Sequence, residues 1–216
     1  MDNERIQSFK EEVANAVTHG AGVIFALIGI PFLITYAIDK GNAATVWSVS
    51  MFSVGMLMVY ISSTLYHAIQ NPGTKFKLRI WDHISIFFMI AGSYTPILQK
   101  YADEATATKF LVLLWSIALV GVVKKIFFTG RFEALSLFLY LGMGWMAVFI
   151  VGPLASKIPT DILTLLIVGG LSYTLGVIFY VWHSLSFHHS IWHLFVLGGT
   201  VTHYFAIYYS VPLYLQ

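Results

Sequence analysis

The segment SLSFHHSIWHLF, residues 184–195, places three histidines in an otherwise largely apolar stretch. His189 and His193 are four residues apart, so on a helix they lie on one face, one turn above the other. An imidazole pair with this spacing can bind a transition metal, but it can also simply be exposed to water at the membrane interface, where a helix begins. His188 lies off that face and is predicted to be a bystander. The chemistry of the pair therefore depends on the elements that surround it.

Composition indicates a membrane protein. Of the 216 residues, 58% are hydrophobic and 10% are charged, whereas soluble domains carry about 25% charged residues. The net charge of +2 is too small to indicate nucleic-acid binding. Because the chain contains no cysteine, neither a disulfide framework nor a thiolate metal site can form. A transition metal would have to be bound by His, Asp, Glu and water.

The apolar segments predict seven membrane-spanning helices, since about 20 apolar residues cross the hydrocarbon core. A short amphipathic lead-in at residues 1–15 precedes the first span, and it lacks the pattern of a cleavable signal peptide. No second domain is indicated, so residues 1–216 are predicted to form one all-α, seven-helix transmembrane bundle. The expected spans are 16–38, 43–66, 80–98, 110–128, 134–151, 162–182 and 191–209.

The positions of lysine and arginine predict the orientation, because cytoplasmic loops are enriched in these residues. Eight of the twelve fall on the side that holds the N-terminus, the second-to-third loop and the fourth-to-fifth loop. The N-terminus is therefore predicted to be cytoplasmic. After seven spans the C-terminus is expected on the outer face.

Isolated polar residues on three spans fall at the same predicted depth. The second span ends on the cytoplasmic side with SSTLYH, which contains Ser63 and His67. The third span begins on that side with RIWDH, which contains Asp82, and the seventh begins there with His189 and His193. Ionisable residues inside a membrane are costly and usually functional. Their agreement in depth favours one shared site near the inner leaflet.

Three imidazoles fit a zinc site with an open fourth position, which is the pattern of catalytic zinc. Ser63 shares a helix face with His67 and could hydrogen-bond a ligand, a water or Asp82. Asp82 could orient a ligand or act as a general base. Each residue also has a simpler role, since Asp82 can pair with Arg79 at a helix start. His67 can hydrogen-bond between helices, and Ser63 can serve close helix packing.

Other histidines are predicted to lie outside this group. His19 could join the periphery of the site or play a structural role beside two nearby glycines. His83 points about 100° away from Asp82 on a helix. His203 lies ten residues past His193, which is roughly 15 Å deeper by helical rise. It is expected to satisfy a neighbour within the bundle.

At these residues the chain resembles the hemolysin III branch of the progestin and adiponectin receptor family. SSTLYH, RIWDHISIFFMIAGSYTP and HHSIWH carry the resemblance in this order, and EEVANAVTHGAG is similar to the N-terminal signature of the branch. The resemblance covers nearly the whole chain. It implies a seven-helix bundle with a cytoplasmic N-terminus in a bacterial inner membrane. It also implies zinc held by His67, His189 and His193, with Ser63 and Asp82 around the bound water.

Two classes of function follow from the resemblance. A wider superfamily that contains alkaline ceramidases implies zinc-dependent hydrolysis of a lipid amide. We expect a membrane hydrolase of an amide or ester of a lipid that comes from the bilayer, in which Asp82 accepts the proton and Ser63 orients the water or the oxyanion. The alternative is a non-enzymatic protein that is cytolytic, pore-forming or receptor-like, with a membrane lipid as ligand. Its zinc would only tie three helices together.

Overall fold

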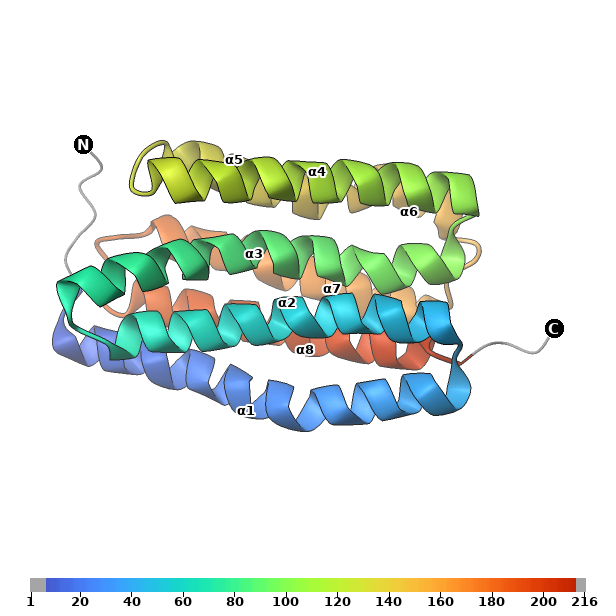
Figure 1. The fold of residues 1–216 in the computed structure, drawn as a ribbon, viewed down its shortest axis with the longest axis horizontal. Coiled ribbons are helices and arrows are strands. Elements are labelled where there is room, and N and C mark those ends of the chain that lie inside the picture. Colours follow the sequence, from blue (N-terminus) through green and yellow to red (C-terminus); the bar gives the residue numbers. More distant parts are fainter. Residues whose placement is uncertain (1–6, 213–216) are drawn as a thin grey trace.

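The structure, a computed structural model, describes residues 7–212. The helices of this part of the chain are α1 (Phe9–Lys40), α2 (Ala43–Ala68), α3 (Pro72–Tyr101), α4 (Glu104–Phe128), α5 (Glu133–Trp145), α6 (Ala147–Leu154), α7 (Thr160–Val181) and α8 (His188–Ser210). Since α5 and α6 follow one another along one path, the chain forms seven roughly parallel rods (Figure 1). The predicted all-α, seven-helix membrane bundle is confirmed.

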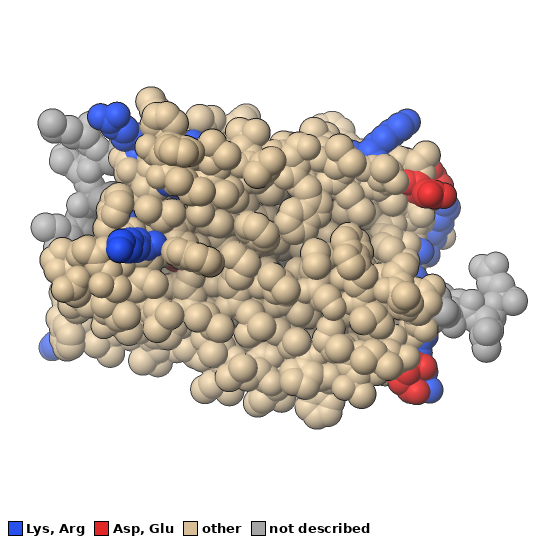
Figure 2. All heavy atoms as spheres, viewed as in Figure 1, with Lys and Arg blue, Asp and Glu red and all other residues tan. Residues whose placement is uncertain are grey.

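The surface consists of an apolar belt between two charged ends. Figure 2 shows Lys, Arg, Asp and Glu gathered toward the two ends of the bundle, while the middle of the visible flank is free of them. Large apolar side chains such as Phe32 and Leu119 are more than half exposed, at 68% and 64%. Soluble proteins rarely expose apolar surface on this scale, whereas lipid is a suitable solvent for it. The chain is therefore a multi-pass protein of the cell membrane.

Two of the seven rods are less apolar than the others. Within the described residues, α1, α2, α4, α7 and the segment Glu133–Ile150 are long and apolar enough to span a membrane on their own. With 30 and 23 residues, α3 and α8 have the length but not the apolarity. They lie inside the bundle, because α3 packs against α2, α4, α5 and α8, and α8 packs against α1, α3 and α7. These neighbours shield the polar residues of α3 and α8 from lipid.

The backbones of α2 and α3 are in direct contact. A Cβ atom on Gly55 would lie 2.8 Å from the carbonyl oxygen of Phe88, and one on Gly92 would lie 2.8 Å from that of Met51. Small residues permit this close approach of helices in membranes. The contact sets the register of α2 against α3, and thereby places the end of α2 beside the start of α3.

The predicted span 134–151 is interrupted at Met146, which separates α5 from α6. The hydroxyl of Tyr94 on α3 accepts the backbone N–H of Ala147 (2.8 Å) and donates to the carbonyl oxygen of Met143 (2.9 Å). A side chain that inserts into the backbone hydrogen bonds of a helix is a known cause of a break. Tyr94 lies 53 positions from Ala147 in the sequence, so the local pattern of the span does not predict the interruption.

Residues 9–15 extend the first helix beyond the predicted start of the span. Of the amphipathic lead-in predicted at 1–15, residues 1–6 lie outside the described part, and the remainder from Phe9 onward is continuous with α1. Ser8 caps this helix in a capping box with Glu11, in which each residue satisfies a backbone N–H of the other. Residues 9–15 of the lead-in are therefore part of one 32-residue helix that reaches the end of the bundle.

Candidate metal centre

The structure brings three histidines together at one end of the bundle. Candidate ligand nitrogens of His67, His189 and His193 all lie within 4.8 Å of one another. His67 stands at the end of α2, and the other two stand in the first turns of α8. Within the described residues, Nε2 of each ring is buried without a hydrogen-bond partner. An unpaired buried polar atom costs about 1–3 kcal/mol, so three adjacent ones indicate that a further species belongs between them.

The donor set fits zinc. Zinc takes imidazole nitrogens at about 2.0–2.1 Å in tetrahedral geometry, which separates the ligand atoms by about 3.4 Å. The candidate ligand nitrogens lie within 4.8 Å of one another, which is at most about 1.4 Å more than this separation. In the part of the chain that the structure describes, this is the one group of three or more His, Asp and Glu residues whose candidate ligand atoms lie close enough together to hold one metal ion. Three histidines leave a fourth position for a ligand from outside the protein.

The other nitrogen of two of these rings is held by α1. Oε2 of Glu12 lies 2.8 Å from Nδ1 of His67. Nδ1 of His193 lies 3.2 Å from the carbonyl oxygen of Asn15 and 3.1 Å from Oγ1 of Thr18. Metal-binding histidines usually donate this second N–H to a carboxylate or carbonyl oxygen, which fixes the tautomer and the ring orientation. With Nδ1 as the donor, Nε2 presents its lone pair to the cluster.

The start of α8, and with it the histidine pair, is also positioned by α1. Phe187 precedes α8 and adopts a left-handed backbone conformation with φ 59°, which costs about 1–2 kcal/mol for an L-residue with a side chain. Its N–H donates to Oε1 of Glu11 at 3.0 Å. One turn further along α1, Asn15 Oδ1 accepts a hydrogen bond from Oγ of Ser190 at 2.5 Å. The two bonds fix the first turn of α8 against α1.

Sequence reasoning did not assign these residues of α1 to the site. The sequence predicts an amphipathic lead-in at residues 1–15. In this part of the chain it indicates only His19 as a residue at the periphery of the site. A signal was nevertheless present, because the polar residues recur with spacings of three and four and so share one helix face. They are Glu11, Glu12, Asn15, Thr18 and His19.

Ser63 and Asp82, which were predicted to act beside the metal, lie at the same end of the bundle. Ser63 is 1% exposed, so its hydroxyl is shielded from solvent. Asp82 is buried, and its carboxyl interacts with that hydroxyl and, electrostatically, with the imidazole of His67. The Asp82 backbone is tied to α2 through Ser85, which donates to the Asp82 carbonyl oxygen (2.6 Å) and accepts from Ser62 (3.2 Å).

His19 lies against the cluster without belonging to it. Its ring stacks on that of His193 with 3.5 Å between centroids and 15° between planes. It is buried, and neither ring nitrogen has a hydrogen-bond partner in the described part of the chain. Three other histidines lie apart from the cluster, each with Nδ1 or Nε2 near an atom of a neighbouring helix: His83 near Nζ of Lys125 (3.1 Å), His188 near the carbonyl oxygen of Phe179 (2.9 Å) and His203 near that of Leu166 (3.1 Å).

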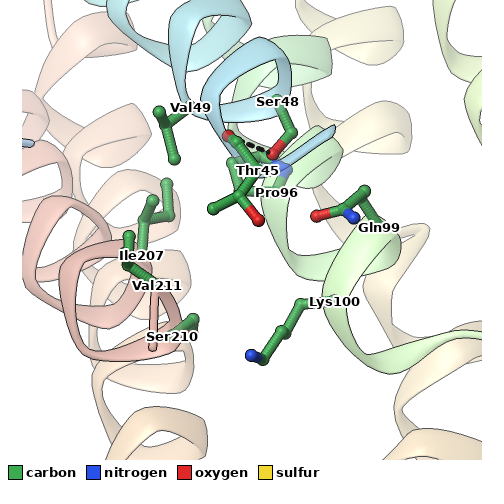
Figure 3. A pocket seen from close by; sticks show the side chains of 9 residues that line it. All are labelled: Thr45, Ser48, Val49, Pro96, Gln99, Lys100, Ile207, Ser210 and Val211. Atoms are coloured by element: carbon green, nitrogen blue, oxygen red, sulfur yellow. Dashed lines mark hydrogen bonds between the residues drawn. The ribbon is translucent and has the colours of Figure 1, made fainter. Parts of the chain in front are cut away.

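A small pocket lies at the other end of the bundle, between α2, α3 and α8 (Figure 3). Its cavity of about 10 Å³ is roughly the space of one water molecule. Lys100 at its edge donates to the carbonyl oxygen of Pro212 at 2.5 Å. None of its nine lining residues is a histidine or a carboxylate, so this pocket offers no ligand set for zinc. The lining residues are Thr45, Ser48, Val49, Pro96, Gln99, Lys100, Ile207, Ser210 and Val211.

Comparison with known proteins gives concordant matches over almost the whole chain. Residues 7–204 match the sequence profile of a family described as haemolysin-III related. The Hemolysin-3 homolog of Bacillus subtilis (strain 168) is 45% identical over 207 residues, covering 95% of this chain and 97% of that protein. Hemolysin-3 of Bacillus cereus is 38% identical over 207 residues, covering 95% and 94%. The monocyte to macrophage differentiation factor of Homo sapiens is 30% identical over 204 residues, covering 92% and 83%.

Proposed function

The chain belongs to the haemolysin-III-related family, and from this premise we propose that it is an integral-membrane, zinc-dependent hydrolase of a lipid amide or ester. The proposal is carried by the three buried, unpartnered Nε2 atoms of His67, His189 and His193, with Asp82 and Ser63 beside them. When bound, zinc would supply a Lewis acid that polarises the scissile carbonyl and activates water.

Asp82 is the general base in this proposal. Its buried carboxylate lies beside the cluster, where it can accept the proton of the attacking water and return it to the leaving amine or alcohol. The buried Ser63 hydroxyl, which interacts with the Asp82 carboxyl, can donate to that carboxylate or to the oxyanion that develops on the carbonyl. One water is thereby added across one C–N or C–O bond.

We place this chemistry at the cytoplasmic leaflet. The cluster lies where α2 ends and where α3 and α8 begin. The sequence puts eight of the twelve Lys and Arg residues on this side, and cytoplasmic loops are enriched in them. The start of α1 and the end of α8 lie at opposite ends of the bundle (Figure 1). The beginning of the chain would then be cytoplasmic and its end would face outward.

A second candidate is a cytolytic membrane protein in which zinc only ties α2 to α8. The name Hemolysin-3 of the Bacillus cereus relative favours this function. The ligand set favours catalysis instead, because structural zinc sites normally have four protein ligands. The cluster found among residues 7–212 contains three.

The deciding experiment compares wild-type protein with Asp82→Asn on a panel of lipid amides and esters, with products identified by mass spectrometry. We expect wild-type protein to release a fatty acid, and the variant to keep zinc while losing about 100-fold or more of the rate. Asp161→Asn, an exposed carboxylate in the first turn of α7, is the matched control. Equal turnover in wild type and Asp82→Asn would remove Asp82 from the mechanism. Zinc-loaded protein that cleaves no lipid but releases dye trapped in vesicles would favour the cytolytic function.

A further inference from the structure

The first turns of α1 carry a polar stripe and an apolar stripe on different faces. The polar stripe contacts the candidate metal centre, as described above. The apolar stripe consists of Phe9, Val13, Ala16 and Val17, which recur three to four residues apart and so share one face. Phe9 is 72% exposed, Val13 46% and Val17 65%. In a membrane protein these side chains are available to lipid.

This apolar stripe forms one wall of a groove of about 310 Å³. The opposite wall is the end of α2 and the residues just after it, namely His67, Ala68 and Gln70. The volume is at the lower end of the 300–1,000 Å³ that is typical of small-molecule pockets. His67 is itself 2% exposed and is a member of the histidine cluster. The groove therefore lies between the lipid-facing flank of α1 and one residue of the candidate metal centre.

We propose that this groove binds the acyl chain of the bilayer lipid whose amide or ester bond is presented to the histidine cluster, an inference that rests on the proposed hydrolase function. The lining residues suit an amphiphilic molecule, because they are apolar along α1 and include polar groups near α2. Phe9, Val13 and Val17 can cover an apolar chain, whereas polar groups stand at the end near α2. There the Gln70 amide donates to the carbonyl oxygen of His67 at 2.7 Å. None of the seven lining residues is a Lys, Arg, Asp or Glu, so a chain can be buried without desolvating one of these charges.

The surroundings of the groove favour a lipid from the bilayer over a water-soluble ligand. Ile24 and Ile28 lie seven and eleven residues beyond Val17, which continues the same outward face of α1. They are 62% and 58% exposed. A chain that approaches from the middle of the membrane thus meets apolar side chains all the way to the groove.

The test is photocrosslinking of protein reconstituted in lipid nanodiscs, with a fatty-acyl amide lipid that carries a diazirine in the middle of its acyl chain. We expect the crosslinks, mapped by mass spectrometry, to concentrate in residues 9–17 and 67–70. Val13→Trp places a large side chain in the groove and should remove most of these crosslinks. Val17→Trp, at a more exposed position of the same wall, is the second variant. Ile24→Trp adds the same side chain to the same face outside the groove and should leave the crosslinks unchanged.

The zinc content and thermal unfolding of each variant show whether the fold and the metal centre are intact. Loss of the groove crosslinks in a zinc-replete Val13→Trp or Val17→Trp protein supports the inference. If the crosslinks spread evenly along the outward face of α1, or if Ile24→Trp loses them equally, they report only the lipid that surrounds any membrane protein. Either outcome overturns the inference. If wild-type protein hydrolyses no lipid but still gives groove-restricted crosslinks, the hydrolase proposal fails while the lipid site stands.

Discussion

Oε2 of Glu12 lies 2.8 Å from Nδ1 of His67, and the other oxygen of the same carboxylate lies 3.0 Å from Nζ of Lys75. One side chain of α1 thus connects the end of α2 with the first turns of α3. The geometry of the histidine cluster is therefore governed in part by a helix that contributes none of its three candidate ligands.

Replacing Glu12 tests this relationship. We expect Glu12→Gln to lower zinc affinity about 10–100-fold, which is the usual effect of losing the carboxylate that orients a ligating histidine. The measurement is a competition titration against a chelator of known affinity. Glu104→Gln, in the exposed first turn of α4, is the control and should bind zinc as wild type does. An unchanged affinity in Glu12→Gln would show that α1 does not orient His67.

The metal content of the purified protein tests the ligand set. Wild-type protein should carry about one zinc per chain, and His67→Ala and His193→Ala should each lose it, because two imidazoles are too few to hold the ion. The metal is measured by mass spectrometry of the acid-digested protein. His203→Ala, on the same helix as His193 but outside the cluster, should keep zinc. Full retention of zinc in His193→Ala would contradict the assignment.

A buried ion pair joins α4 to α5 beside the site. Nζ of Lys125, which is 0% exposed, lies 2.5 Å from Oε2 of Glu133 and 3.1 Å from Nδ1 of His83. Lys125→Met should lower the free energy of unfolding by about 3–5 kcal/mol, because it leaves a carboxylate without its partner in a poorly solvated place. The double variant Lys125→Met/Glu133→Gln should recover much of this loss.

Unfolding by denaturant in mild detergent gives these free energies, and the exposed Lys109→Met is the control. Glu133→Gln is measured as the second single variant. If the loss of stability in the double variant equals the sum of the losses in Lys125→Met and Glu133→Gln, the pair contributes no coupling energy and the prediction is wrong.

The contact between α2 and α3 gives a prediction about packing. Gly92→Ala should destabilise the protein by about 1–3 kcal/mol, the usual cost of overpacking, since its Cβ would lie 2.8 Å from the carbonyl oxygen of Met51. A Cβ on Gly142 would have no atom within 4 Å apart from its chain neighbours and the backbone of its own helix. Gly142→Ala should therefore be neutral or stabilising, because alanine favours helix by about 1 kcal/mol over glycine. Thermal unfolding of both variants in one detergent makes the comparison, and equal melting temperatures would contradict it.

The number of rods, and the end of the bundle at which the polar residues lie, could be predicted from sequence because both depend on distance along the chain. An apolar run of about 20 residues has few uses other than crossing a bilayer. Once the spans are counted, the turn of a helix in which Asp82 or His189 stands follows from its position in the span. The proximity of the histidines on α2 and α8 was predicted in this way.

Contacts that depend on how one helix is rotated against another could not be predicted from the sequence. The polar residues at the start of α1 fit a helix at the membrane surface as well as one that faces a site, until α2 and α8 are placed beside it. Likewise the break at Met146 is caused by Tyr94, which comes from another helix. The stack of His19 on His193 joins residues from α1 and α8, and no local spacing indicates it.

The order of the helices has a consequence for biosynthesis. α8 carries two of the three candidate ligands and follows every other helix of the described chain, while α1, which holds the second nitrogen of two rings, precedes them all. Because a nascent chain acquires structure from its N-terminal side onward, six rods are made before the second imidazole of the cluster exists. A chain that stalls before α8 cannot form the centre. Zinc, which would stabilise only the state that binds it, would thus selectively stabilise chains whose synthesis has reached the last rod.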